Sequence, residues 1–274
     1  MPAPDVLTSS STSAGRSGAL PQRLVVAWQH PKRRLIEPVG MLTFDGRTYE
    51  FGYIRNALRV KDFRPLLGFA DLHRSYTAQS LFPLFAQRAM DPRRPDYHRY
   101  LARLGLEGEP GPLEQIARSQ GRRQGDTIQL LPVPAVGDEV AFLFLVNGVR
   151  HVPERPLMLG GSEIHVTREQ VEAALGQLRQ GDVLGLVNEP ENPVNPLAVL
   201  VTASSVPVGW VPDLLAEDLY RLRDRAAVNI TVAHVNGPDA PWHLRLLARL
   251  HATRTSDFQF FTGEKWQPLS SDVQ

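Results

Sequence analysis

The chain has 274 residues, 42% of them apolar and 22% charged, which is enough apolar material for two cores of the usual domain size of about 100–200 residues. It contains no cysteine, which excludes disulfides, thiolate metal sites and thiol nucleophiles and fits a cytoplasmic location. Because no apolar run approaches the ~18–20 residues of a membrane span, we expect no membrane contact, and the first residues lack the apolar region of a secretory signal.

The net charge of +1 conceals an uneven distribution. Residues 1–130 carry 19 Lys and Arg against 12 Asp and Glu, whereas residues 131–274 carry 11 against 17. The two halves attract each other, or the basic half faces a polyanion, or the surfaces simply differ without a functional meaning. A long groove that follows phosphates needs clustered cations, so the acidic half suits a single strand end better than a long track.

Strands are predicted first along the chain. Residues 1–20 are rich in Ser, Thr, Ala, Gly and Pro, which predicts a disordered tail. Short apolar runs follow at Leu24–Trp28 and Val39–Phe44, and the pair Asp45-Gly46 precedes a third run, Thr48–Tyr53. Two such runs on either side of Asp-Gly are a strong hairpin signal.

Helical spacing replaces the strand pattern from Gln79 onwards. One helix is predicted around Leu81–Phe85, a second from Pro95 to Gly105, and a third around Leu113–Ala117. Strands followed by helices predict an α+β domain over residues 21–132, built on a mixed β-sheet.

The Pro- and Gly-rich segment Leu131–Gly137 is the predicted domain boundary, and beyond it the pattern is mostly β. A helix is expected over Arg168–Leu178, with Thr167 as its N-cap, and another over Pro212–Arg223, with acids early and arginines late. The apolar runs predict strands at Val140–Val149, Val183–Val187, Leu197–Val201, Val206–Val211, Val228–Val235 and Leu244–Leu250. Six short strands and two helices predict a small closed or half-closed β-barrel over residues 138–255. Residues 256–274 are expected to form a C-terminal tail, loosely packed beyond Lys265.

No motif indicates catalysis. The chain lacks a Gly-Lys-Ser/Thr phosphate loop, a Gly-x-Ser-x-Gly elbow, a His-Glu-x-x-His pair and the signatures of kinases. Its eight histidines include no i,i+4 pair, although a zinc site assembled from distant strands stays open. We therefore expect a protein that is not an enzyme and that has no catalytic residues, no metal site and no cofactor.

One polar turn is the most specific feature of the sequence. In Gly181–Val201, GDVLGLVNEPENPVNPLAVLV, three prolines fix the backbone between two strands and leave Asn188, Asn192 and Asn195 with amide groups able to donate and accept. Such a turn suits a ligand with hydroxyl and phosphate oxygens. The alternative is a plain loop whose asparagines cap its own backbone.

This stretch resembles the core motif of the HIRAN family, which runs Gly-Asp, apolar strand, Glu-Pro-x-Asn-Pro-Tyr-Asp, apolar strand and Val-Gly-Tyr-hydrophobe-Pro. Here Pro207–Val211, PVGWV, and Pro212 match the last part, and Asn147–His151, NGVRH, is similar to the end of the family's first strand. The resemblance covers about residues 138–255. It implies a β-barrel that binds single-stranded DNA or a DNA 3′ end and stacks its terminal bases.

Transferred to this chain, the resemblance gives provisional roles to single residues. Arg150 would pair with a phosphate, and His151 would replace a stacking aromatic ring. Asn192 would hydrogen-bond the end nucleotide. Asn195 stands where the family has an aspartate that accepts from the 3′-hydroxyl, and Val194 stands where it has a tyrosine. Both departures weaken the expected recognition of the 3′ end.

Two tryptophans complete the expected DNA-binding set. Trp210 would offer a stacking or packing surface and Trp242 a second one, since stacking contributes roughly 1–3 kcal/mol per base whatever the sequence. The alternatives are that Trp210 belongs to the core and that Arg150 forms a surface ion pair.

A looser resemblance concerns residues of about 22–130. Leu24–Val26, Val39–Leu42, Tyr49–Tyr53, Arg64–Leu66 and Leu81–Phe85 are similar to the N-terminal subdomain of HipA-like kinases, without the kinase core. The first hypothesis is therefore a non-catalytic nucleic-acid-binding protein of DNA repair or defence. The second is an antitoxin-like regulator that binds a HipA-like kinase or another operon partner. A kinase, helicase or nuclease is the protein partner that these resemblances imply.

Overall fold

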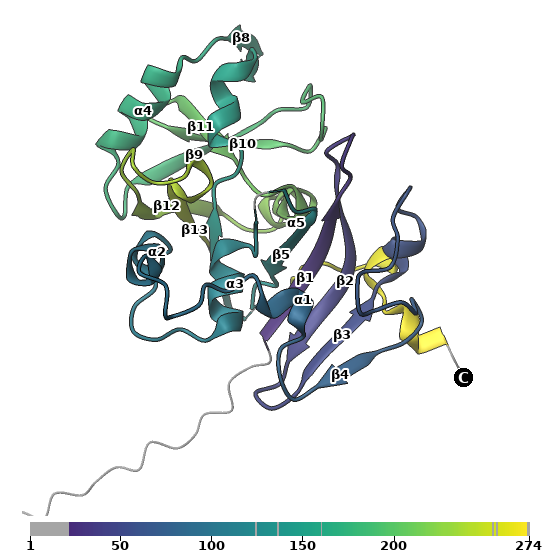
Figure 1. The fold of residues 1–274 in the computed structure, drawn as a ribbon. Helices are drawn as coiled ribbons and strands as arrows, with labels where there is room; N and C mark the ends of the chain where they lie inside the picture. Colours follow the sequence, from purple (N-terminus) through teal and green to yellow (C-terminus); the bar gives the residue numbers. More distant parts are fainter. Residues whose placement is uncertain are drawn as a thin grey trace, which may run out of the picture.

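The computed structural model describes residues 22–123, 125–135, 137–159, 161–253, 255 and 257–272, so the predicted tail over residues 1–20 lies outside the described part. The fold is α+β. Two antiparallel sheets, one in each half of the chain, lie next to each other, with helices packed around them (Figure 1).

The first sheet has the strand order β4-β3-β2-β1-β5. Its strands are β1 (Gln22–Gln29), β2 (Ile36–Phe44), β3 (Tyr49–Tyr53), β4 (Tyr76–Ala78) and β5 (Ile128–Pro132). Each pairing is antiparallel, so the prediction of a mixed sheet is wrong. The Asp45-Gly46 hairpin is confirmed: Asp45 Oδ1 accepts hydrogen bonds from the backbone N–H groups of Arg47 and Thr48, at 2.8 and 2.7 Å.

Three helices accompany this sheet. They are α1 (Pro83–Ala86), α2 (Tyr97–Arg103) and α3 (Pro112–Ser119), and a 3₁₀ turn η1 (Arg55–Leu58) follows β3. The helix expected around Leu81–Phe85 begins only at Pro83, because proline fits the first turn of a helix and not its interior. Phe51, Tyr53 and Phe85 are almost completely buried in the core between the sheet and helices α1 and α3, whereas Tyr97 and Leu101 of α2 pack with residues of the second half.

The second sheet has the order β11-β10-β9-β12-β13-β6. Its strands are β6 (Glu139–Leu145), β9 (Val183–Asn188), β10 (Val199–Ala203), β11 (Val206–Trp210), β12 (Val228–Val235) and β13 (Leu246–Thr253); the hairpin β7 (Leu157–Leu159) and β8 (Ser162–Ile164) is separate. The two predicted helices are present as α4 (Arg168–Gln177) and α5 (Asp213–Arg223). Thr167 is the N-cap of α4 and forms a capping box with Gln170.

The edges of the second sheet approach each other at one point. Directly after β6, Asn147 pairs with Trp210 of β11 through two backbone hydrogen bonds of 2.8 Å. A single bridge does not make β6 and β11 paired strands, so the sheet is open among the described residues. The closed barrel stays a prediction.

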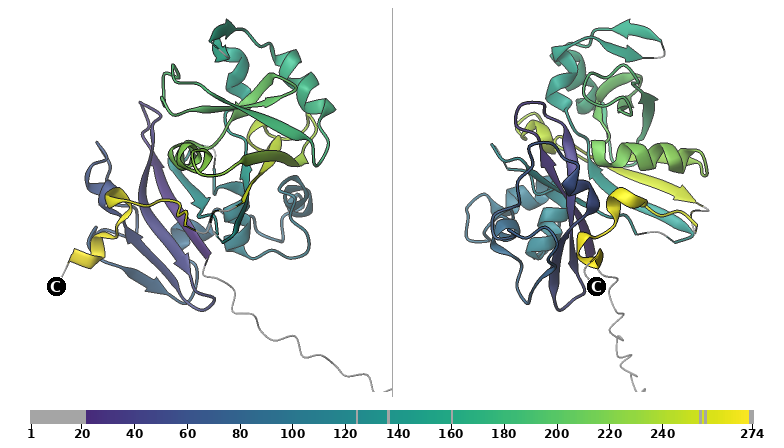
Figure 2. Two further views of the ribbon diagram at one scale, coloured as in Figure 1. Left: turned by 180° about the vertical axis from the view of Figure 1, so that it is seen from behind. Right: turned by 90° about the vertical axis from the view of Figure 1, so that its right-hand side faces the viewer.

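The two halves share a hydrophobic core. Val25 of β1 and Leu131 of β5 belong to the buried cluster of the second half, and α5 lies beside the first sheet (Figures 1 and 2). The segment predicted as a boundary therefore begins inside a strand that contributes to both halves. In the part of the chain that the structure describes, no helix is long and apolar enough to cross a bilayer.

The C-terminal segment returns to the first half, beside β3 and β4 (Figure 2). Pro268 pairs with Ile54, the N–H of Arg55 donates to the carbonyl of Gln267 at 2.8 Å, and Leu269 is only 1% exposed. The expectation of loose packing beyond Lys265 is wrong for these residues, because an apolar side chain of the segment completes the core of the first half.

Candidate nucleic-acid interface

The turn after β6 places two predicted site residues. Gly148 has φ +68°, and a Cβ there would lie 2.7 Å from Cε3 of Trp210, so glycine is required both for the left-handed backbone and for the close approach of the ring. The chain then enters a 3₁₀ helix, η2 (Val149–Glu154), which buries Val149 and leaves Arg150 and His151 exposed. The expected position of these two residues at the end of a strand is therefore wrong.

Arg150 and His151 contact each other. Nε of Arg150 donates to Nε2 of His151 at 3.0 Å, and Nδ1 of His151 faces a carboxylate oxygen of Glu154. An imidazole that accepts at Nε2 carries its proton at Nδ1, which suits the carboxylate. The ring thus orients the guanidinium of Arg150, a role different from the base stacking that we predicted for His151.

The polar turn between β9 and β10 is built around a buried carboxylate, that of Glu189, which is 0% exposed. Its Oε2 accepts from Nδ2 of Asn192 and from Nε1 of Trp210, both at 2.7 Å. Nη2 of Arg155 lies 2.7 Å from Oε1, without the alignment of a hydrogen bond. The sequence analysis missed Glu189, although its position before Pro190 in the motif was a signal.

Asn192 also caps the backbone of its own turn. Its Oδ1 accepts from the N–H groups of Val194 and Asn195, at 3.0 and 3.2 Å. The structure therefore brings Asn192 and Trp210 together, but through a carboxylate inside the protein. This is the arrangement of the alternative that we left open, in which the asparagines hold the loop.

Asn195 links the turn to helix α5. Its Oδ1 accepts from the N–H of Leu197 at 2.9 Å, and its Nδ2 donates to Oδ1 of Asp213 at 3.1 Å. Burial raises the pKa of Asp213, while the hydrogen bond from Asn195 and the positive charge of Arg122 oppose that rise. The neutral amide at position 195 thus lies directly beside a carboxylate on another element.

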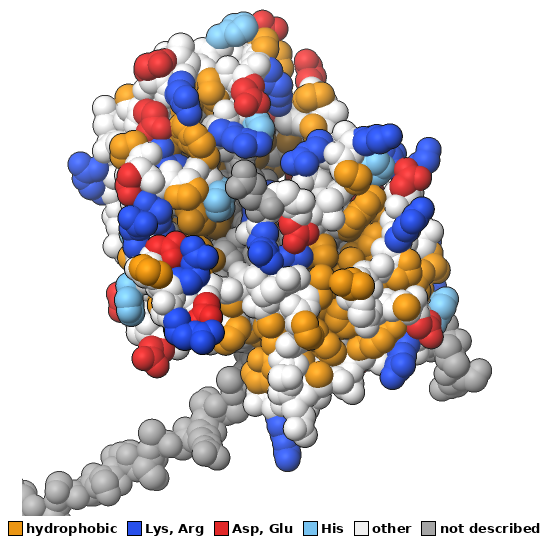
Figure 3. Space-filling view, in the orientation of Figure 1, with side chains coloured by type: hydrophobic (Ala, Val, Ile, Leu, Met, Phe, Trp, Pro, Cys, Tyr) orange, Lys and Arg blue, Asp and Glu red, His pale blue; other side chains and the backbone are white. Residues whose placement is uncertain are grey.

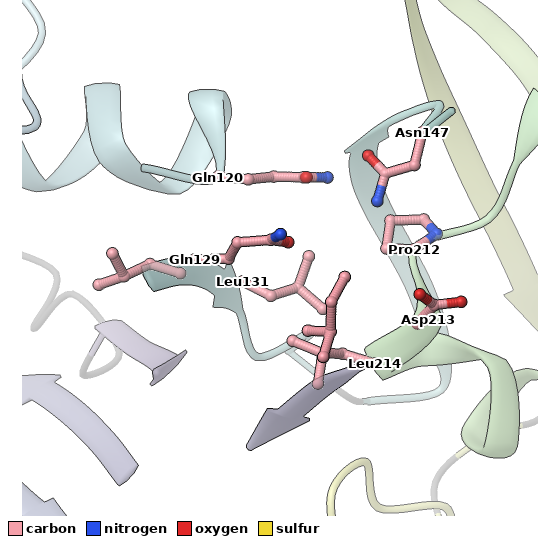
Figure 4. Close-up of a pocket in the computed structure, with 9 residues that line it drawn as sticks. Gln120, Gln129, Leu131, Asn147, Pro212, Asp213 and Leu214 are labelled. Atoms are coloured by element: carbon pink, nitrogen blue, oxygen red, sulfur yellow. The ribbon is translucent and has the colours of Figure 1, made fainter. Parts of the chain in front are cut away.

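A small cavity with polar and apolar lining residues lies next to Asp213, between the two halves. Gln120 and Gln129 line it from one side and Asn147 and Asp213 from the other (Figure 4). Its volume is about 10 Å³, close to the minimum for one water molecule. The cavity is too small for a nucleotide, so the surface must provide any larger site.

A wider hollow of about 540 Å³ opens between η2 and the start of α4. Arg155 and Arg168 are among the residues that line it. The guanidinium of Arg155 lies 5.7 Å from the ring centre of Trp210, and that of Arg168 lies 4.9 Å from the ring centre of Trp242. Each predicted tryptophan is thus covered by an arginine that faces the hollow.

Three arginines from different elements lie near the small cavity: Arg122 donates to Oδ1 of Asn147 at 3.3 Å, Arg150 follows Asn147 by three residues, and Ile36, two residues after Arg34, lines the cavity together with Asn147. Arg34 lies in the β1–β2 turn, Arg122 follows α3, and Arg150 lies in η2. Burial lowers the pKa of Arg122, with further lowering from the charges of Arg34 and Arg150, whereas Asp213 opposes it. Figure 3 shows Lys and Arg side chains gathered around a hollow on this face. The sequence analysis missed Arg34 and Arg122; the positive charge of the first half was their only signal.

The described residues contain no candidate metal site. Over the described ranges, no group of three or more His, Asp or Glu side chains is arranged to hold a metal ion. The candidate site is thus one of arginines, amides and aromatic rings, which are groups for binding anions and stacking on flat rings.

Comparisons with known proteins find similarity to a solved structure but to no family model. No family model matches the chain, and no curated protein matches it. Among solved structures, the HIRAN domain of human HLTF is similar, with 18% sequence identity, a TM-score of 0.26, and coverage of 43% of this chain and 80% of that chain. At this TM-score the match carries no argument about the site. The resemblance of residues 22–130 to HipA-like kinases stays a sequence-based hypothesis.

Proposed function

We propose that this chain is a non-catalytic protein of the cytoplasm that binds single-stranded nucleic acid, or a DNA 3′ end, on the face formed by η2 and the polar turn. The observation that carries the proposal is the hollow between η2 and the start of α4, lined by Arg155 and Arg168, each of which lies over a tryptophan ring, with Arg150 exposed on the neighbouring η2. A role in DNA repair or defence belongs to the same proposal, as does a protein partner such as a helicase or nuclease.

The chemistry of the hollow favours unpaired bases over a duplex. Guanidinium planes stack on exposed bases, and an arginine already held over an indole presents its other face to a ligand. Two apolar side chains of the polar turn, Val194 and Leu197, are 43% and 39% exposed and add apolar surface. Bases within a duplex are already stacked on one another and would gain little from these groups.

Asn192 and Asn195 then act mainly as a scaffold. Each amide nitrogen uses one of its two N–H groups within the protein, so each keeps one to donate to a ligand. No carboxylate stands at position 195 to select a 3′-hydroxyl. We therefore expect preference for single strands, with weak discrimination between a 3′-hydroxyl and a 3′-phosphate.

Fluorescence anisotropy tests the proposal with labelled single strands ending in a 3′-hydroxyl or a 3′-phosphate, a blunt duplex and an RNA strand, all at low salt. The single strands are expected to bind at least about tenfold more tightly than the duplex, the difference that stacking of one base provides. Replacing Arg150 by Ala should weaken binding to every sequence alike and reduce the salt dependence by one phosphate contact, a slope change of about 0.7.

Arg47→Ala is the matched control, because Arg47 is an exposed arginine at the β2–β3 turn, the opposite end of β2 from the arginine cluster. It should leave binding unchanged. Equal affinity for duplex and single strands, or equal losses in the two variants, would contradict the proposal. ATP hydrolysis or phosphorylation that a point mutation abolishes would contradict the non-catalytic part.

A further inference from the structure

The arginine cluster of Arg34, Arg122 and Arg150 is assembled from both halves of the chain. Arg34 and Arg122 belong to the basic first half, whereas Arg150 belongs to the acidic second half. His243, at the 3₁₀ turn η3 (Trp242–Leu244), borders the cluster: partial burial lowers its pKa, and the charges of Arg122 and Arg150 lower it further. The cluster is thus a place of concentrated positive charge at the junction.

Neutral groups hold the cluster in place. Nη1 of Arg122 is 3.3 Å from Oδ1 of Asn147, and Nη2 is 3.3 Å from Oε1 of Gln129. Arg150 donates to an imidazole. Amide and imidazole acceptors orient a guanidinium without cancelling its charge, in contrast to a carboxylate. These bonds fix the direction of Arg122 and Arg150 while their charge stays available.

Several arginines elsewhere in the molecule are paired with carboxylates. Arg88 lies 2.6 Å from Asp126, Arg103 lies 2.6 Å from Asp239, and Arg245 contacts Glu172 through two bonds of 2.7 Å. Within the described part of the chain, by contrast, no carboxylate lies within ion-pair distance of Arg34, Arg122 or Arg150. Glu154 reaches Arg150 only through His151, and Asp213 reaches Arg122 only at longer range.

We infer that Arg34, Arg122 and Arg150 form a phosphate-binding site shared by the two halves, which holds the backbone of the strand whose bases enter the neighbouring hollow. The identification of the ligand as a nucleic-acid strand rests on the proposed function, whereas the affinity for phosphate groups does not. Guanidinium groups bind phosphate through paired hydrogen bonds, and clustered like charges gain most when an anion comes between them.

The β1–β2 turn offers a closely matched pair of variants. Arg33 and Arg34 are adjacent, exposed and equal in charge, but the charge of Arg33 lowers the pKa of Asp62 whereas that of Arg34 lowers the pKa of Arg122. Arg34 has φ 62°, a conformation that neither arginine nor glutamine favours, so Arg34→Gln adds no backbone strain. Both variants lower the net charge by one, and only Arg34→Gln changes the cluster.

Two probes separate this inference from the proposed function. With a labelled single strand, Arg34→Gln should flatten the plot of log affinity against log salt by about 0.7, so that raising salt fourfold costs about 2.6-fold less affinity than in the unaltered protein. Arg33→Gln should leave the slope unchanged. With pyrophosphate, compared with chloride at equal ionic strength, the unaltered protein and Arg33→Gln should melt at a higher temperature, and Arg34→Gln should show a smaller rise.

Each outcome decides one of the two ideas. If no oligonucleotide binds but pyrophosphate still distinguishes Arg34→Gln from Arg33→Gln, the proposed function fails and the phosphate site stands. If oligonucleotides bind but both variants behave alike with both probes, the shared site is overturned and the proposed function stands. A double variant, Arg34→Gln with Arg150→Gln, that binds pyrophosphate as well as the unaltered protein also overturns the site.

Discussion

The polar turn around Glu189 and the arginine cluster around Arg122 lie close together but differ in how their charges are balanced. In the turn, a carboxylate is completely buried and each of its oxygens has a neighbour within 2.7 Å. In the cluster, cations are held by neutral amides and an imidazole. The turn that carries the sequence motif therefore has a structural role. The positive charge available to a ligand lies beside it, in the arginine cluster.

Asp213 connects the two regions. It accepts a hydrogen bond from Asn195 of the turn and feels the charge of Arg122 in the cluster. A change at Asp213 should therefore affect both stability and binding, whereas changes at Glu189 should act mainly on stability and changes at Arg34 mainly on binding.

The largest effect is expected for Glu189→Ala. The substitution leaves the N–H groups of Asn192 and Trp210 without their acceptor and Arg155 without its counter-ion. Removing one member of a buried ion pair costs about 3–5 kcal/mol; because the Arg155 side chain is 31% exposed and water can reach it, we expect the lower end, about 3 kcal/mol. Denaturant unfolding measures the loss. Glu191→Ala, an exposed carboxylate of the same turn, should stay within about 0.5 kcal/mol of the unaltered protein. Equal effects would mean that the turn does not depend on Glu189.

A smaller and pH-dependent effect is expected for Asp213→Asn. Because the folded-state pKa of Asp213 is raised, its contribution to stability is complete below the usual pKa of 3.8 and is lost as the pH rises through the folded-state pKa. Asparagine does not titrate. The variant should therefore gain stability relative to the unaltered protein as the pH rises from about 4 to 7.

The same variant should bind a single strand more tightly, since it removes an anion near Arg122. Unfolding curves at several pH values and anisotropy at neutral pH check the two effects. A difference in stability that is independent of pH would contradict the assignment of the titration to Asp213.

The smallest effect is expected for the stability of Arg34→Gln. An exposed arginine without a carboxylate partner contributes little to folding, so the change should stay within about 0.5 kcal/mol. Relief of repulsion from Arg122 should make the variant slightly more stable at low salt, and the gain should disappear at about 1 M salt, where the Debye length is about 3 Å. Denaturation midpoints at two salt concentrations test this. A clear loss of stability would mean that Arg34 stabilises the fold and would contradict this prediction.

Local signals in the sequence predicted much of the fold. The Asp45-Gly46 hairpin, the Thr167 cap of α4 and the strand β12 follow from turn chemistry, capping and alternation, which depend on neighbouring residues only. Strand β5 was missed because its short run merges with the proline-rich segment that follows it. The turn at Gly148 was missed although Asn147-Gly148 is a local turn signal; the second requirement for glycine, the ring of Trp210, is distant in sequence.

The site was also predictable only in part, because local sequence signals do not show contacts between distant residues. The motif placed Asn192, Asn195 and Trp210 in one region, but the sequence does not show that Glu189 occupies their hydrogen-bonding groups. Arg34, Arg122 and Arg150 are far apart in the chain, and only the packing of the two sheets brings them together. Charge balance indicated which half is basic, not where its arginines meet.

The return of the C-terminal segment to the first sheet has a consequence for biosynthesis. Ile54 pairs with Pro268, 214 residues later, and Leu269 fills the core of the half that leaves the ribosome first. At about 5–20 residues per second, about 10–40 s of translation separate the two partners. Long-range pairing of this kind slows folding. The core of the first half therefore stays incomplete until residues 268 and 269 have been synthesised, and a nascent chain stalled before residue 268 exposes an apolar surface that chaperones would recognise.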